Sequence, residues 1–177
     1  WKAAWKSRGW NPVVLGPLDV MKHPKYKAFR AAVSAFPTVN PKTYELVCYL
    51  RWLALSYVGG GLMVDYDVIP GTLFPKDIAE LRKSDKLQPF QCRPGSAVPS
   101  AMLAPKGALA KWIVAMQSYS GPVGQEAGRA HLSDQAILNQ QLDQDWVDAT
   151  HGLVKEFGED GWAGAQLVHF AAGACAK

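Results

Sequence analysis

The sequence predicts a single α/β domain over residues 1–177 with a mostly parallel central sheet. Segments of helical periodicity alternate with short, wholly apolar runs, and a pair of carboxylates follows one of those runs. The 177 residues, 49% hydrophobic and 19% charged, are enough to bury a core and too apolar for a disordered chain.

A long helix followed by a short buried strand is the clearest pair of elements. Asn40-Pro41 supplies an N-cap and a proline for the start of a helix over residues 42–58, and Gly59-Gly60-Gly61 ends it. Residues 62–64 form a wholly apolar run, which predicts a central strand. The other predicted elements are the end of a helix at 1–9, helices at 23–36, 75–83, 107–119 and 133–142, and strands at 10–15, 89–92, 100–104 and 166–170.

Charge and composition limit the possible partners. The formal net charge of +4 suits phosphate groups, but the basic residues are scattered, so nucleic acid is not an expected partner. No apolar run reaches the roughly 20 residues that span a bilayer, so we expect no membrane span. The three cysteines show no paired spacing and indicate neither a disulfide framework nor a zinc site. No signal peptide opens the sequence, and its first residue is not methionine, which is compatible with the loss of an upstream piece. The compartment stays open: the cytoplasm for a microbial or viral protein, the Golgi lumen for a eukaryotic fragment.

Two aspartates lie at the carboxyl end of the predicted central strand, where open α/β sheets bind ligands. In extended backbone, residues two apart point the same way, so Asp65 and Asp67 are predicted to share a divalent cation. Such an ion can bridge the phosphates of a nucleoside diphosphate. The alternative is a pair of exposed aspartates in a turn.

Arg51 lies in the middle of the long helix among apolar residues, where a buried guanidinium needs a carboxylate or phosphate partner. A surface arginine with its stem along the helix is the alternative. Arg51, Tyr57 and Gly60-Gly61, followed by D-x-D, resemble the sugar-binding region of glycosyltransferases with a D-x-D motif. That family includes the yeast initiating mannosyltransferase and the inositolphosphoceramide mannosyltransferases. Met63 stands where an aromatic residue is common in the family.

Three later segments are similar to the same kind of enzyme. Ser120-Gly121-Pro122 looks like the family's T/S-G-P turn, and residues 133–139 resemble the D-Q-x-x-L-N segment of glycogenin-like sugar transferases. For the latter, helix N-capping is the structural alternative. His169, with Gly173 and Lys177 after it, looks like the C-terminal segment that closes such sites.

The resemblance implies a GT-A-like, Rossmann-type sandwich and a metal-dependent hexosyltransferase. It implies Mn²⁺ or Mg²⁺, a UDP- or GDP-sugar donor, a glycan or lipid acceptor, and retention at the anomeric carbon. The residues implied for the donor are Arg51, Tyr57, Gly60, Gly61, Asp65 and Lys177, those for the metal are Asp65, Asp67 and His169, and the catalytic residues that hold the transferred sugar are Asp134 and Gln135. Asp134 as the general base of an inverting enzyme is an alternative. Such enzymes begin with a strand that holds the nucleotide base, whereas this chain starts at what looks like the following helix. Either that strand is missing from this chain and lies upstream, or the base is bound differently.

Two other functions compete with the transferase. A haloacid-dehalogenase-type phosphatase also places D-x-D after an apolar strand, but Ile69 occupies the position for Thr or Val and no later G-D-x-x-x-D follows. A non-catalytic domain that binds nucleotide sugars is the second competitor, because fold does not fix function.

Overall fold

The computed structural model describes residues 1–170, apart from the side chain of Cys92. Its α-helices are α1 (Lys2–Ser7), α2 (Pro17–Met21), α3 (Tyr26–Ser34), α4 (Lys42–Tyr57), α5 (Lys106–Gln117) and α6 (Asp134–Asn139). Its strands are β1 (Gly60–Val64), β2 (Val68–Pro70), β3 (Gln88–Arg93), β4 (Ser96–Pro105), β5 (Gly124–Glu126), β6 (Arg129–His131), β7 (Val154–Glu156) and β8 (Leu167–His169). Short 3-10 turns cover Pro75–Ile78, Leu81–Lys83 and Trp162–Gly164.

The long helix and the strand after it are confirmed as α4 and β1. The cap of α4 differs in one detail from the prediction, because its N-cap is Pro41 and no side chain caps it. Asn40 instead donates a hydrogen bond from Nδ2 to Oε2 of the buried Glu45, over 2.9 Å. The α4–β1 unit places Arg51 and the D-x-D segment beside one another.

The predicted GT-A-like, Rossmann-type sandwich with a mostly parallel central sheet is wrong. The structure has two three-stranded sheets, ordered β1-β4-β3 and β2-β8-β7, and a separate β5-β6 hairpin. Their strand pairs are antiparallel except for β7 and β8. The cause is local: only Pro94 and Gly95 separate β3 from β4, and so short a connection can only form a hairpin. The alternative of the same fold without its first strand fails for the same reason.

The β1-β4-β3 sheet is covered on both faces, which explains the apolar run along β4. Successive side chains point to opposite faces, so Met102 and Ala104 enter one core while Ala101 and Leu103 enter the other. The first core lies against α3, α4, α5 and α6, and its largest buried side chains include Phe29, Tyr49, Trp52 and Trp112. The second lies against α1 and the β2-β8-β7 sheet and contains Trp5, Val68, Leu73, Ile78, Phe90, Val154 and Leu167.

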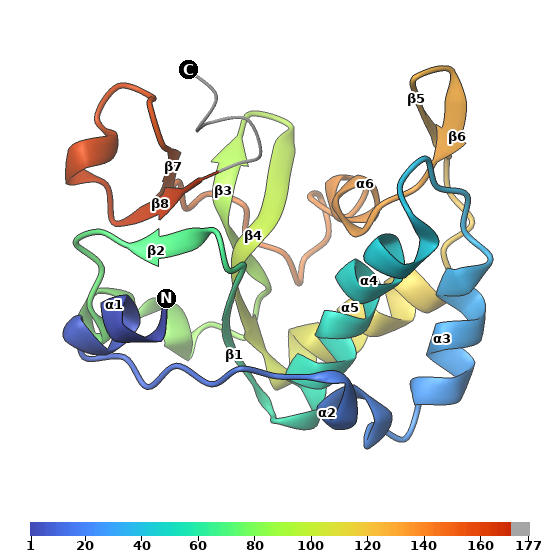
Figure 1. Cartoon of the computed structure of the whole chain (residues 1–177), viewed down its shortest axis with the longest axis horizontal. Coiled ribbons are helices and arrows are strands. Elements are labelled where there is room, and N and C mark those ends of the chain that lie inside the picture. The colour runs from blue at the N-terminus through green and yellow to red at the C-terminus, as the bar shows by residue number, and fades with distance from the viewer. Residues whose placement is uncertain (171–177) are drawn as a thin grey trace.

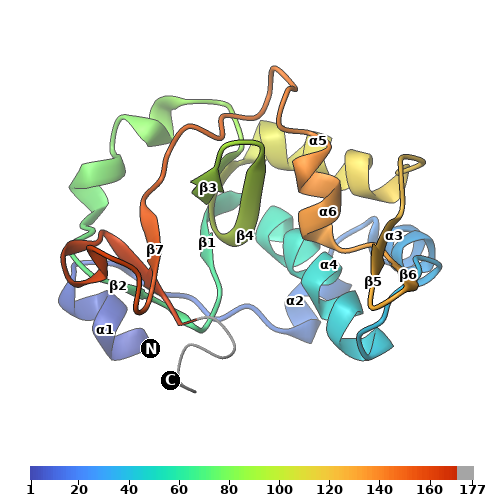
Figure 2. The same ribbon diagram turned by 90° about the horizontal axis from the view of Figure 1, so that it is seen from above.

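The other elements pack on the two faces of the β1-β4-β3 sheet. Figure 1 shows α1 and the β2-β8-β7 sheet on one side of β1 and the larger helices on the other, and Figure 2 shows the same division from above. The β5–β6 hairpin projects beyond the end of α4. The turn between β1 and β2 therefore lies where the two halves of the molecule meet.

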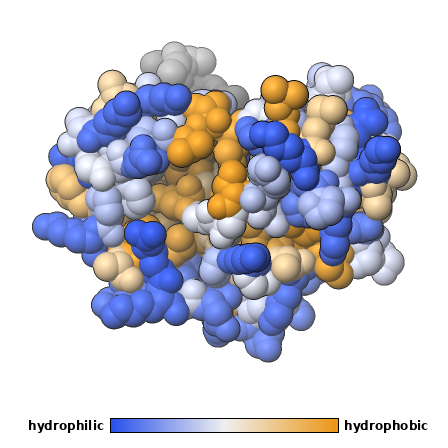
Figure 3. All heavy atoms as spheres, turned by 90° about the horizontal axis from the view of Figure 1, so that it is seen from below, coloured by the Kyte–Doolittle hydropathy of each residue, from blue (hydrophilic) through white to orange (hydrophobic). Residues whose placement is uncertain are grey.

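The segment before α2 does not form the strand predicted at 10–15. Residues 10–16 pair with no sheet, and Pro12 lacks the backbone N–H that a ladder needs. The segment is fastened by Trp10, whose Nε1 donates to the Leu73 carbonyl over 3.1 Å. The exposed apolar residues of this segment and of α2 are Val13, Val14, Leu18 and Met21. These elements lie at the bottom of Figure 1, and Figure 3 shows apolar side chains among polar ones on the face seen from below.

Candidate functional site

The turn that follows β1 directs three consecutive side chains at three different parts of the chain. The backbone N–H of Val68 donates to the Asp65 carbonyl over 3.1 Å, which closes the turn. Asp65 pairs with Arg51 of α4, Tyr66 contacts Trp1 beside α1, and Asp67 faces His169 of β8. The extended geometry predicted for this segment would aim both carboxylates at one point, whereas the turn gives each its own partner.

Arg51 joins the turn to the start of α6. One terminal nitrogen of its guanidinium pairs with Oδ1 of Asp65, and the other donates to Oδ2 of Asp134 over 2.7 Å. The same Oδ2 atom accepts a hydrogen bond from Nε1 of Trp52 over 2.9 Å. Asp134 is only 4% exposed, so its charge is compensated inside the protein rather than by water.

The electrostatic environment of this cluster follows from burial and from the charges that Arg51 balances. Burial alone would lower the pKa of Arg51, but the attraction of Asp134 and Asp65 raises it above its ordinary value. Burial raises the pKa of Asp65, and Arg51 opposes that rise. Burial, with Asp134 nearby, raises the pKa of the Cys48 thiol to about 11, so this thiol is protonated and unreactive near neutral pH.

Asp67 and His169 form the pair that best fits a divalent cation. Oδ2 of Asp67 lies 3.5 Å from Nε2 of His169, too far for a strong hydrogen bond and suitable for two atoms that share an ion. The antiparallel pairing of β2 with β8 fixes this distance, because Val68 lies opposite His169. Nδ1 of His169 is buried and has no hydrogen-bond partner among the described residues. Within residues 1–170 no group of three or more His, Cys, Asp or Glu side chains is placed to hold a metal. A cation at this pair would take a carboxylate and an imidazole from the described residues, and a diphosphate would add oxygens.

The remaining described residues that were predicted for the donor lie at the end of α4 and the start of β1. Gly60 has a φ of +91°, and a Cβ there would lie 2.4 Å from the Ala104 carbonyl oxygen, so close sheet pairing requires glycine. Gly61, with a φ of +136°, is also in a conformation that favours glycine, although it has open space around it. Tyr57 is 46% exposed and carries Lys22 5.7 Å above its ring, which places it at the surface beyond Arg51.

The predicted catalytic residues occupy the first turn of α6. The Ser133 hydroxyl accepts a hydrogen bond from the Ala136 backbone N–H over 3.2 Å, so Ser133 is the N-cap of this helix. Asp134 is buried below Arg51, while Gln135 next to it is half-buried. Lys177, predicted for the donor, lies outside the described residues.

Two side chains that contact or adjoin the predicted residues have no role assigned from the sequence. Trp52 was hidden inside an apolar helix face, and only its position next to Arg51 could have suggested that its N–H reaches a buried carboxylate. Tyr66 lies between the two aspartates and is 68% exposed, and an aromatic residue inside a D-x-D turn was the available signal.

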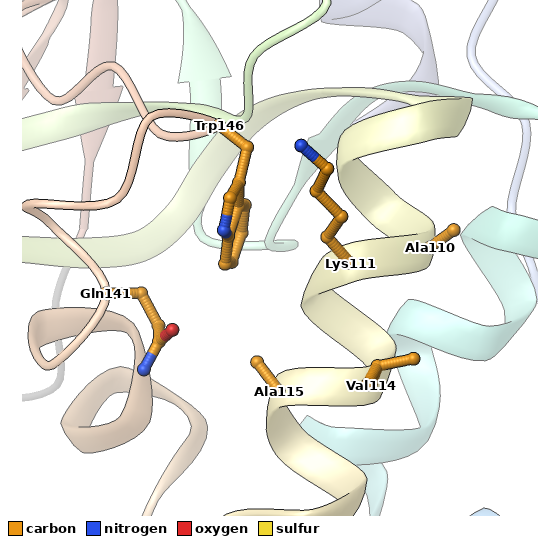
Figure 4. A pocket seen from close by; sticks show the side chains of 6 residues that line it. All are labelled: Ala110, Lys111, Val114, Ala115, Gln141 and Trp146. Atoms are coloured by element: carbon orange, nitrogen blue, oxygen red, sulfur yellow. The ribbon is translucent and has the colours of Figure 1, made fainter.

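Two hollows in the surface lie away from these residues. One, of about 440 Å³, is lined by Ala110, Lys111, Val114, Ala115, Gln141 and Trp146 (Figure 4). The other, of about 450 Å³, is lined by Gln91, Arg93, Gly152, Val154, Lys155, Glu159 and Asp160. Neither contains a residue that the sequence analysis assigned to the donor, the metal or the transferred sugar.

Comparison with known proteins gives one partial match. A family model described as a domain of unknown function (DUF8765) matches residues 1–85, which include α4, β1 and the Asp65–Asp67 turn but neither Asp134 nor His169. No curated protein and no solved structure matches the chain. The resemblance to glycosyltransferases therefore rests on the sequence motifs alone, since the family model that matches names no function. No helix within residues 1–170 is both long and apolar enough to cross a bilayer.

Proposed function

We propose that this chain binds a nucleoside diphosphate sugar with a divalent cation and belongs to a hexosyltransferase, which moves the sugar to a hydroxyl of a glycan or lipid acceptor. The observation that best supports this proposal is the distance of 3.5 Å between Oδ2 of Asp67 and Nε2 of His169. The two were predicted for the metal from separate motifs, one in the middle of the described residues and one at their end. Mn²⁺ or Mg²⁺ at this pair would offset the charge of the departing diphosphate.

The chain's own residues would hold the donor in place. Arg51 keeps Asp65 at the edge of the turn, and α6 keeps Arg51 there through Asp134. Preorganised charges that need no rearrangement are the usual source of transition-state stabilisation. Asp134 is a poor general base in this arrangement, because its Oδ2 atom already accepts two hydrogen bonds and its side chain is buried. This favours retention over an inverting reaction that uses Asp134, and it leaves the half-buried Gln135 as the α6 residue for the transferred sugar.

The test is thermal unfolding with Mn²⁺ alone, with each UDP- or GDP-sugar alone, and with both. A donor at about a hundred times its Kd should raise the midpoint by about 5–10 °C only when the metal is present. Chelation with EDTA should reverse the rise. Asp67→Asn, which keeps the shape of the side chain, should abolish the rise, whereas Asp143→Asn, at an exposed aspartate far along the chain, should preserve it. A folded Asp67→Asn protein that still responds to metal and donor together would contradict the proposal.

A non-catalytic domain that binds nucleotide sugars is the second candidate. It is favoured by the sheet topology, because residues 1–170 form small, mostly antiparallel sheets rather than the parallel sheet expected of the transferase fold. The two candidates differ in turnover: release of UDP or GDP in the presence of metal and an acceptor supports the transferase, and donor binding without release supports the binding domain.

A further inference from the structure

Tyr66 differs from both neighbours in the turn, because its side chain is presented to solvent. Asp65 and Asp67 face side chains of α4 and β8, whereas the Tyr66 ring is 68% exposed and its hydroxyl has no hydrogen bond to any residue within 1–170. Large aromatic side chains usually bury most of their apolar surface. An exposed one next to a pair of carboxylates is a feature of the site that the proposed donor chemistry does not use.

The exposed Tyr66 ring contacts Trp1, and Trp1 in turn contacts Trp5. The rings of Trp1 and Tyr66 meet edge to face, with centroids 5.5 Å apart. Trp1 is held in turn by a hydrogen bond from its Nε1 to the Val68 carbonyl over 3.2 Å, and by Trp5, whose ring centroid lies 6.0 Å away. Trp5 is itself buried in the second core. The Tyr66 ring is thus positioned before any ligand arrives, which lowers the entropic cost of binding to it.

Tyr66 and the cationic side chain of Arg51 lie on opposite sides of the turn. Arg51 approaches the turn from α4, while Tyr66 is contacted from the α1 side, and these helices lie on opposite sides of β1 (Figures 1 and 2). The charged neighbours of Tyr66 in the turn are two carboxylates. A neutral polyol suits this position, because its hydroxyls can donate to the exposed carboxylate of Asp67 while its C–H face covers the ring.

We propose that the Tyr66 ring is a stacking platform for a pyranose ring of the acceptor, with Oδ1 of Asp67, the oxygen that does not face His169, accepting a hydrogen bond from that sugar. The assignment of the bound sugar to an acceptor rests on the proposed transferase function. The binding of a pyranose to Tyr66 does not, and the two can be tested separately. The platform places a sugar of the acceptor next to the residues that would hold the donor.

The experiment uses ligand-observed NMR on the full chain with a panel of methyl pyranosides and disaccharides of mannose, glucose, galactose and N-acetylglucosamine. At least one should bind, and Tyr66→Ala should weaken it at least about tenfold because the stacking surface is lost. Tyr66→Phe keeps the ring and should stay within about twofold of the unmodified protein. Tyr44→Ala removes a tyrosine of similar exposure, 60%, from the other end of α4 and should have no effect.

The same variants are tested for the rise in unfolding midpoint with Mn²⁺ and a nucleotide sugar, which separates the two proposals. Tyr66→Ala should leave that rise unchanged. If Tyr66→Ala lost the rise in unfolding midpoint but still bound the pyranoside, the ring would hold the nucleotide base and the platform would be overturned. The absence of pyranoside binding to the unmodified protein would also overturn it. Tyr66-dependent pyranoside binding in a protein that responds to no nucleotide sugar would uphold the platform and refute the donor site.

Discussion

The guanidinium of Arg51 pairs with Asp65 through one nitrogen and with Asp134 through another, so a single side chain joins α4, the turn after β1 and α6. The pairing with Asp134 occurs where that carboxylate is 4% exposed. A buried ion pair of this kind adds little compared with apolar packing, but breaking it leaves an uncompensated buried charge. The arrangement therefore makes Arg51 a positioning residue for Asp65 and Asp134, and its loss should affect stability.

We expect Arg51→Met to lower the free energy of unfolding by about 3–5 kcal/mol, because it strands the Asp134 carboxylate. In a domain of this size the unfolding midpoint should fall by about 10 °C. Adding Asp134→Asn to Arg51→Met should recover part of the loss, because the stranded charge is then gone. Thermal and urea unfolding of the two single variants and the double variant measure this coupling.

The matched control is Arg82→Met at an exposed arginine, which should change the free energy of unfolding by less than about 0.5 kcal/mol. If Arg51→Met and Asp134→Asn were additive in the double variant, the ion pair would not be the cause.

At this scale the sequence singled out residues that the structure brings together, but it did not predict their mutual contacts. Arg51, Asp65 and Asp134 were all predicted for the site, and all three meet. Their mutual pairing could not be predicted, because Arg51 and Asp134 are 83 positions apart and several folds are compatible with the motifs. The apolar surroundings of Arg51 did indicate that it needs a buried partner, which is the physical reason that the residue stood out.

At the scale of elements, two neighbouring glycines at the junction of α4 and β1 differ in how closely they approach β4. Gly59 and Gly60 have nearly the same φ, +92° and +91°, but only at Gly60 would a Cβ meet the Ala104 carbonyl. The two positions therefore separate the cost of backbone conformation from the cost of a steric clash.

Gly59→Ala should lower the free energy of unfolding by about 1–2 kcal/mol through backbone strain alone. Gly60→Ala should cost more, about 3 kcal/mol or above, because β1 must also move away from β4. Urea unfolding of both variants measures the difference. Equal losses would mean that the sheet adjusts freely at Gly60 and that the contact with Ala104 does not restrict β1.

The elements also show where sequence-based prediction failed. Helix α4 and strand β1 were predicted because periodicity, caps and glycines agree within a short stretch. The error in sheet type came from treating 89–92 and 100–104 as strands of a parallel sheet. Pro94 and Gly95 between two apolar runs are a hairpin signal, which indicates antiparallel strands. Whether two consecutive strands pair in parallel or antiparallel depends on the length of the connection between them. The two-residue connection between β3 and β4 allows only the antiparallel pairing.

At the scale of the whole molecule, strand β4 belongs to both cores. Met102 and Ala104 pack with the helices on one face, and Ala101 and Leu103 pack with α1 and the β2-β8-β7 sheet on the other. The proposed metal pair depends on this sharing, because Asp67 follows β1 and His169 ends a strand of the second sheet. If the two cores unfolded separately, loss of the second sheet alone would separate the pair while the helices stayed folded.

We therefore expect the two cores to unfold in a single cooperative transition. Leu109→Ala in the helical core and Leu73→Ala in the second core each remove a fully buried side chain and should each cost about 2–5 kcal/mol. Far-UV circular dichroism and tryptophan fluorescence, followed in urea, should give coincident curves for both variants, with both midpoints lowered. The test discriminates because the helices dominate the dichroism, while the tryptophans report on both cores through Trp112 and Trp5. If Leu73→Ala produced an early fluorescence change and left the dichroism transition in place, the second core would be a separate unit. The contact between Asp67 and His169 would then depend on the less stable second core. A metal bound at this pair should stabilise that core and make the dichroism and fluorescence curves coincide again.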